Sequence, residues 1–147
     1  MIVLDASAAV DWLLQTSAGL SIEQRIYSRN ETLHAPHLLD LEVTQVLRRL
    51  ALQGLVSVYR AEQAVRDLLD LRITRYAHSV LLPRIWQLRH HFSAYDAAYI
   101  VLAEKLGVAL ITRDARLASA SGHAASVELS SFGGTVCALN THICSIV

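Results

Sequence analysis

Four acidic residues of this chain occupy positions from which their carboxylates can act together: Asp5, Glu42, Asp96 and Asp114. Two of them end apolar runs typical of buried strands, and the other two lie in the first turns of expected helices. At one edge of a sheet such groups would repel one another and hold protons near neutral pH unless a cation neutralised them. Oxygen ligands favour hard ions, Mg²⁺ or Mn²⁺, and such an ion can activate water and hold a phosphate. The set therefore indicates a metal site.

Each acid also has a structural explanation that the sequence leaves open. The two at strand ends suit helix N-caps, for which Asp is a preferred residue. Asp96 fits a capping box with Ser93, although helical spacing also places it on an apolar face that should point inward. Glu42 borders an apolar stripe and could be a solvated edge residue. Asp40, near the same helix start, is explained by a favourable interaction with the helix dipole, and the sequence does not decide whether it joins the site.

The expected elements explain why these acids should meet. Short apolar runs predict strands, and amphipathic or apolar segments predict helices between them. The expected strands are 2–4, 33–36, 73–76, 108–112 and 126–129, and the expected helices are 6–15, 21–28, 38–53, 61–71, 79–90, 93–107 and 115–120. Strands alternating with helices indicate an α/β fold whose parallel sheet is covered on both faces. In such sheets, sites form beyond the carboxyl ends of the strands, which is where Asp5 and Asp114 fall.

The composition fits one compact domain. The chain has 147 residues, of which 53% are hydrophobic and 18% charged, and its formal net charge is zero. No apolar run approaches the roughly 18 residues that a membrane-spanning helix needs, and the start of the chain has no basic signal segment. We therefore expect a cytoplasmic protein without membrane contact. The two cysteines, Cys137 and Cys144, do not make the disulfide framework of a secreted domain.

Four motifs around the acids resemble those of PIN-domain proteins, specifically the VapC toxins of bacterial toxin–antitoxin pairs. The matching stretches are 2–8 (IVLDASA), 36–42 (PHLLDLE), 93–99 (SAYDAAY) and 110–117 (LITRDARL). They occur in the order and spacing of that family. The resemblance covers about residues 1–129.

The resemblance implies a PIN-like three-layer fold, with a parallel sheet of about five strands flanked by helices. It implies a Mg²⁺- or Mn²⁺-dependent endoribonuclease in which Asp5, Glu42, Asp96 and Asp114 are both the catalytic and the metal-binding residues. The implied reaction is attack of water on an RNA phosphodiester, which leaves a 5′-phosphate and a 3′-hydroxyl. The implied partners are RNA, a second copy of the chain in a homodimer, and a VapB-like antitoxin whose C-terminal segment lies in the cleft.

Residues next to the acids receive supporting roles. By the same resemblance, Ser7 and Thr112, each two residues from a strand-end acid, are expected to orient the carboxylates. Arg113 and Arg116 flank Asp114 and are candidate contacts for RNA phosphate, with ordinary surface charge as the alternative.

The aromatic residues and the end of the chain carry weaker expectations. Trp12, Trp86 and Tyr95 could stack on RNA bases, although core packing explains each of them as well. We place the PIN domain at residues 1–129. The tail, residues 130–147, has no charged residue and departs from the family pattern. We expect it to pack on the domain or at a dimer interface, without a part in catalysis.

Other classes of protein remain as alternatives. Related folds with similar acids include structure-specific nucleases, and a catalytically inactive PIN-like module would bind only RNA or protein. The presence of all four acids disfavours an inactive module. A phosphoacceptor domain also clusters acids but needs a lysine after its last strand, whereas Lys105 is the only lysine and precedes an expected strand.

Overall fold

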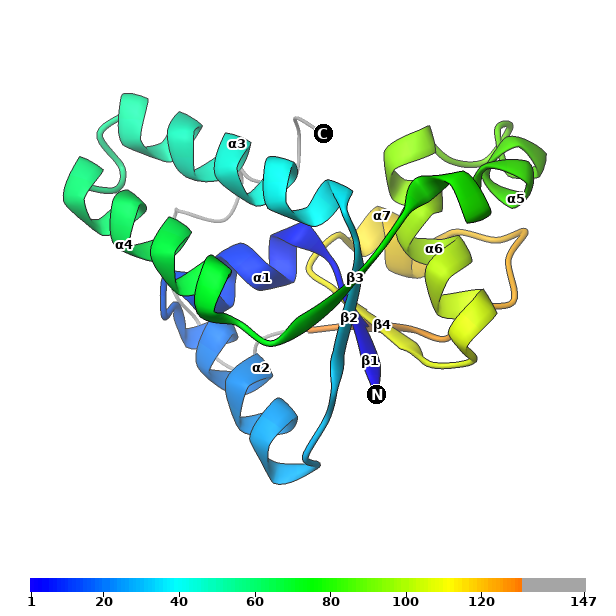
Figure 1. Ribbon diagram of the computed structural model, residues 1–147, viewed down its shortest axis with the longest axis horizontal. Helices are drawn as coiled ribbons and strands as arrows, with labels where there is room; N and C mark the ends of the chain where they lie inside the picture. The colour runs from blue at the N-terminus through cyan, green and yellow to red at the C-terminus, as the bar shows by residue number, and fades with distance from the viewer. Residues whose placement is uncertain (131–147) are drawn as a thin grey trace.

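The computed structural model describes residues 1–130; the remaining residues, 131–147, on which the expectation for the tail falls, lie outside the described part. Strands and helices alternate along the chain, as the hydrophobic pattern predicts (Figure 1). The elements are β1 (Ile2–Leu4), α1 (Ala6–Leu13), α2 (Ser17–Ser28), β2 (Leu33–Pro36), α3 (Leu38–Leu52), α4 (Val58–Asp70), β3 (Ile73–Tyr76), the 3₁₀ helix η1 (His78–Val80), α5 (Leu82–Gln87), α6 (Ala94–Leu106), β4 (Ala109–Thr112), α7 (Ala115–Ser119) and β5 (Val127–Leu129).

The five strands form one parallel sheet in the order β3-β2-β1-β4-β5. The centre of this order is β1, where Val3 is in register with His34 on one side and Leu110 on the other. The chain moves outward from β1 to β3 and then returns to β4, so the strand order reverses between β1 and β4. Open α/β sheets bind ligands at such a switch point, beyond the carboxyl ends of the strands. The switch point therefore predicts a site at the residues that follow β1 and β4.

Helices cover both faces of the sheet and complete an α/β fold of three layers. Helices α1 to α4 lie on one side, and α3 and α4 form a hairpin that extends to one end of the molecule (Figure 1). On the other side α6 packs against β1, β2 and β4, with α5 beside it. Strands β1 and β2 are buried throughout, and in α6 every residue from Ala97 to Ala103 is buried. This apolar packing fixes where β1, β4 and the start of α6 end up relative to one another.

Two helices begin earlier than the sequence pattern predicts, because hydroxyl caps set their starts. Helix α2 begins after Thr16, whose hydroxyl accepts a hydrogen bond from the backbone N–H of Gly19 at 3.1 Å. Gly19 lies where α2 crosses α1, and a Cβ there would stand 2.0 Å from the carbonyl oxygen of Asp11. Helix α4 begins after Ser57, which caps it through Arg60 N–H in the same way. The chain thus tolerates a glycine inside α2 because only glycine allows the close approach.

The expected single helix at 79–90 is wrong. The structure has a short 3₁₀ helix, η1, followed by the six-residue α5. Pro83 lies in the first turn of α5. Proline is tolerated there because the backbone N–H groups of a first turn have no partner within the helix, so a missing N–H costs no hydrogen bond. The proline therefore marks a helix start within the segment and separates η1 from α5. In residues 1–130, no helix is long and apolar enough to cross a membrane.

Candidate active site

Asp5 is the buried centre of the candidate site. It follows β1 directly, is the N-cap of α1 and is only 9% exposed. Its Oδ2 accepts hydrogen bonds from the hydroxyls of Ser7, at 2.5 Å, and Thr112, at 2.7 Å. No side chain of residues 1–130 donates to its other carboxylate oxygen in the same way. The two hydroxyls thus orient the carboxylate, and a backbone hydrogen bond from Ala6 also stabilises its charged form.

The same hydroxyls tie the end of β4 to the end of β1. Thr112 accepts from the backbone N–H of Asp114 at 2.9 Å, while Ser7 accepts from the backbone N–H of Arg113 at 2.9 Å. Each hydroxyl therefore donates to Asp5 and accepts from the loop that carries Asp114. The two strand-end acids are held in a fixed relation across the switch point of the sheet.

Asp114 caps the short helix α7 and forms an ion pair with Arg116. Its Oδ1 accepts from the backbone N–H of Arg116 at 2.8 Å, as expected of an N-cap. The guanidinium of Arg116 folds back onto the same carboxylate, with Nη2 2.8 Å from Oδ2 and Nε 3.3 Å from Oδ1. The Asp114 side chain is 15% exposed and that of Arg116 is 67% exposed. Arg116 can therefore swing into solvent, whereas Asp114 stays in the site.

Asp96 lies in the first turn of α6, which Ser93 caps. Ser93 is the N-cap, and its hydroxyl accepts from the backbone N–H of Asp96 at 3.1 Å and donates to its Oδ2 at 2.9 Å. The carboxylate is half-buried beside the apolar face of α6. Capping and a place in the site are therefore compatible for this residue.

Glu42 lies on α3 and is held by a residue that the sequence interpretation did not assign. The hydroxyl of Tyr99 donates to Glu42 Oε2 at 2.5 Å, and Tyr99 is itself buried. Tyr99 follows Asp96 by one turn of α6, so the two side chains lie on the same helical face. That spacing was the signal in the sequence that could have included Tyr99. The contact brings α3 to the same edge of the site as α6.

The pKa values show that the acids act on one another. Burial raises the pKa of Asp5 above its ordinary value, and the charge of Asp96 adds to this. Burial likewise raises the pKa of Glu42 to about 7, with further contributions from Asp5 and Asp96. The pKa of Asp96 is raised by burial and then by Asp114, while Arg116 opposes the rise. All four carboxylates therefore belong to one electrostatic cluster, which a cation would stabilise.

The cluster is not a closed metal cage. In residues 1–130, no three His, Cys, Asp or Glu side chains lie close enough together to hold a metal ion as they stand. Without a cation, like charges keep carboxylates apart. The donor chemistry nevertheless fits Mg²⁺ or Mn²⁺, because the cluster offers carboxylate and hydroxyl oxygens.

Asp40 forms an ion pair with Arg75, which is not one of the acids or supporting residues of the cluster. Its carboxylate forms a bidentate ion pair with Arg75 of β3, with Nε 2.8 Å from Oδ2 and Nη2 2.9 Å from Oδ1. Arg75 also donates to the backbone carbonyls of Leu68 and Ile73. The pair thus joins α3 to β3, and it gives Asp40 a structural task that the helix-dipole explanation did not include.

Arg113 is also engaged. Its Nε donates to Asp11 Oδ2 at 2.8 Å, and its Nη1 donates to the backbone carbonyl of Ser130. The Arg113 side chain is 16% exposed and the Asp11 side chain 7% exposed. These contacts favour a role in holding the loop before Asp114, and an RNA contact by Arg113 stays an untested prediction. Asp11 was not identified from the sequence, although an acid inside the apolar helix α1 was a signal for a buried pair.

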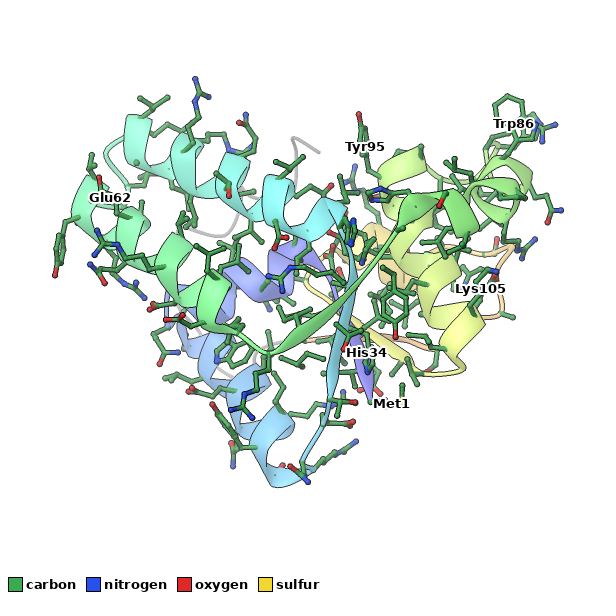
Figure 2. All side chains as sticks on the ribbon, viewed as in Figure 1. Met1, His34, Glu62, Trp86, Tyr95 and Lys105 are labelled. Carbon is green, nitrogen blue, oxygen red and sulfur yellow. The ribbon has the colours of Figure 1, made fainter. Side chains whose placement is uncertain are left out.

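The aromatic residues named in the sequence analysis lie in different environments. Trp12 is buried in the core, whereas Trp86 is 69% exposed and Tyr95 is 56% exposed. Figure 2 shows Trp86 at the far end of the molecule, beside α5, and Tyr95 at the start of α6 on the side of α3. Of the three, only Tyr95 is exposed next to an acid of the cluster.

The chain is similar in sequence to known proteins over most of its length. The model of the PIN domain family matches residues 2–122. The chain belongs to the PIN-domain family. It is 43% identical to ribonuclease VapC12 of Mycobacterium tuberculosis over 129 residues, which cover 88% of this chain and 98% of that protein.

Solved structures support the fold of this PIN domain. The crystal structure of PAE2754 from Pyrobaculum aerophilum superposes with a TM-score of 0.57 at 27% identity, covering 79% of this chain and 76% of that one. Mycobacterium tuberculosis VapC20, described as a toxin that cleaves the sarcin–ricin loop, superposes with a TM-score of 0.56 at 16% identity. It covers 75% of this chain and 87% of that one, and at this identity the likeness concerns the fold alone.

Proposed function

We propose that this PIN-domain protein is the toxin of a VapBC-type toxin–antitoxin pair and a metal-dependent endoribonuclease. The observation that carries the proposal is the electrostatic coupling of the four acids near the carboxyl edge of the sheet. Asp5 and Asp96 raise the pKa of Glu42, Asp96 raises that of Asp5, and Asp114 raises that of Asp96. The similarity to a protein named as a VapC ribonuclease supports RNA as the substrate.

The four carboxylates would hold Mg²⁺ or Mn²⁺, which supplies charge stabilisation to the phosphate and a more acidic bound water. Asp5 is held in a fixed orientation by Ser7 and Thr112, which both donate to its Oδ2. In this scheme the hydroxyls of Ser7 and Thr112 orient carboxylates and take no proton. Tyr99 orients Glu42 from the core side in the same sense.

Arg116 is the residue with two alternative partners in this proposal. Its guanidinium covers the carboxylate that a metal would use, and it is exposed enough to leave. A divalent metal held by Asp114 would compete with Arg116 for that carboxylate, and the 67% exposed Arg116 side chain could then bind an RNA phosphate bidentately. The Arg113 side chain, which is paired with Asp11 and 16% exposed, is the more buried of the two arginines.

The expected partners follow from the same site. An antitoxin of the VapB type would inhibit by placing a cationic side chain, most simply Arg, among the acids, because a guanidinium can bridge two carboxylates. Arg116 already places a guanidinium on one acid of the cluster, Asp114. We further propose that the protein acts in the cytoplasm and forms a homodimer, as the resemblance to VapC toxins implies. A nuclease that acts on structured DNA or RNA remains the second candidate, because its acids would be the same.

The decisive experiment is cleavage of total cellular RNA by the purified full chain, with Mg²⁺ or with excess EDTA. We expect new 5′-phosphate ends at defined sites with Mg²⁺ and none with EDTA. Asp5→Asn should abolish these ends, while Asp40→Asn, which removes a nearby acid engaged with Arg75, is the matched control and should cut normally. Cutting that survives EDTA or Asp5→Asn would refute the proposal. Equal cutting of flap or hairpin DNA would favour the second candidate.

A further inference from the structure

A hollow of about 330 Å³ lies between α3 and the start of α6, immediately beside the acid cluster. We call it the α3–α6 hollow. Its residues are Leu38, Leu41, Glu42, Gln45, Val46 and Arg49 of α3, together with Tyr95 of α6. Figure 2 shows Tyr95 near the top of the molecule, between these two helices. The hollow is therefore framed by apolar side chains, with a few polar groups among them.

The hollow is continuous with the candidate active site. Glu42 belongs to both, since it lines the hollow and is held by Tyr99 inside the cluster. Tyr95 directly precedes Asp96 in the sequence and lines the hollow together with Glu42. An RNA strand with one phosphodiester at the acids must place a neighbouring nucleotide close by. Since Glu42 belongs to both the cluster and the hollow, the α3–α6 hollow would lie beside such a phosphodiester.

The chemistry of the hollow suits a nucleobase. Tyr95 is 56% exposed and Leu41 73% exposed, so an aromatic face and an apolar side chain are open to a flat ligand. Gln45 and Arg49 lie three and seven residues after Glu42, which places all three on one face of α3. An amide and a guanidinium can bond to the polar edge of a base while its face stacks on an aromatic ring. Arg49 also adds the positive charge that an RNA strand requires.

We propose that the α3–α6 hollow binds the base of a nucleotide that flanks the scissile phosphodiester, stacked on Tyr95. The inference rests on the proposed ribonuclease function and identifies where the enzyme selects its substrate. An antitoxin segment or a second copy of the chain would cover the same apolar side chains. The continuity with the acid cluster and the mixture of aromatic, amide and guanidinium groups favour a base, and the other two occupants are outcomes of the test.

The test begins with the cleavage site of the wild-type protein, mapped in total RNA through its 5′-phosphate ends. A synthetic RNA spanning that site is then the probe for steady-state cleavage by Tyr95→Ala, Tyr95→Phe and Tyr59→Ala. Tyr59 is the matched control, because it is an exposed tyrosine of α4 that lies outside the hollow. Tyr95→Ala should raise KM at least about fivefold, the loss expected for one stacked base, with kcat nearly unchanged. Tyr95→Phe, which keeps the ring, and Tyr59→Ala should leave KM close to that of the wild type.

An abasic nucleotide, placed in turn at each position beside the cleavage site, separates stacking from a general structural effect. One position should raise KM for the wild type by the same factor as Tyr95→Ala does. At that position, Tyr95→Ala acting on the abasic RNA should show a KM increase no larger than either change causes alone, because both changes remove the same contact. Additive losses at every position, or an unchanged KM for Tyr95→Ala, would overturn the inference while leaving the ribonuclease function intact.

Two further outcomes identify the competing occupants. If Tyr95→Ala changes the mass of the protein measured by light scattering and leaves KM unchanged, the hollow is an interface between copies of this chain. If Tyr95→Ala leaves KM and mass unchanged but abolishes inhibition by an antitoxin, the occupant is the antitoxin. Either result overturns the base-binding inference. Absence of any metal-dependent cleavage by the wild type would overturn the proposed function and this inference with it.

Discussion

Glu42→Gln should remove part of the pH dependence that we expect for the free energy of unfolding of the metal-free protein. Burial, together with the charges of Asp5 and Asp96, raises the pKa of Glu42 from 4.5 to about 7. Between these values the folded protein binds the Glu42 proton more tightly than the unfolded chain does. The contribution of Glu42 to the free energy of unfolding is therefore fully present below pH 4.5 and is lost as the pH rises through about 7.

The size of this effect follows from the same two pKa values. A change of one pKa unit corresponds to about 1.4 kcal/mol, so the complete effect for a fully buried group would be about 3 kcal/mol. Glu42 is only partly buried, and solvent screening reduces the expected loss to about 1–2 kcal/mol. Gln at this position cannot ionise, so the variant should not show this part of the loss.

The assay is urea unfolding in EDTA at several pH values from about 5 to about 8. The stability of Glu42→Gln relative to wild type should rise across this range by about 1–2 kcal/mol. Glu62→Gln is the control, because Glu62 is an exposed glutamate of α4 (Figure 2). Mg²⁺ should abolish the decline in the wild type, since metal binds the ionised carboxylates. A stability difference that is the same at both ends of the range would refute the reasoning.

Three other substitutions test separate parts of the structure. Arg116→Gln should raise the affinity of the RNA-free protein for Mn²⁺ about fivefold, measured by titration calorimetry. The exposed ion pair, which is worth up to about 1 kcal/mol, then no longer competes with the metal for Asp114. A weaker Mn²⁺ affinity would contradict this. Gly19→Ala should destabilise the fold by at least about 3 kcal/mol in urea unfolding, since the added Cβ would stand 2.0 Å from the carbonyl oxygen of Asp11. A urea midpoint equal to that of the wild type would refute this close approach. Asp40→Asn should cost about 1 kcal/mol of stability, measured in the same way, and loss of RNA cleavage by a folded variant would place Asp40 in the active site.

The strands and the place of the acids could be predicted because they depend on local patterns. The runs 2–4, 33–36 and 73–76 are β-branched or end at a proline, and each forms a strand with those bounds. Parallel pairing brings all carboxyl ends to one edge, so the sequence predicted that Asp5 and Asp114 lie at the same edge. The direct pairing of β1 with β4, which makes the two acids neighbours, was not predicted.

The contacts that complete the site could not be predicted in this way. Tyr99 and Glu42 are 57 residues apart, and Arg113 and Asp11 are 102 residues apart. Each pair depends on how helices pack across the sheet, which the periodicity of one segment does not specify. The break between η1 and α5 had a local signal in Pro83, and there the hydrophobic pattern outweighed it.

The central claim is that four carboxylates form one site for a divalent metal, and Mn²⁺ titration of the RNA-free protein tests it most directly. Calorimetry would compare the wild type with single variants of Asp5, Glu42, Asp96 and Asp114, each changed to its amide, and with Asp40→Asn as control. We expect the wild type and the control to bind Mn²⁺ alike, and each of the four amide variants to bind at least about tenfold more weakly. If two or more of the four bind Mn²⁺ as the wild type does while remaining folded, the four-carboxylate site is contradicted.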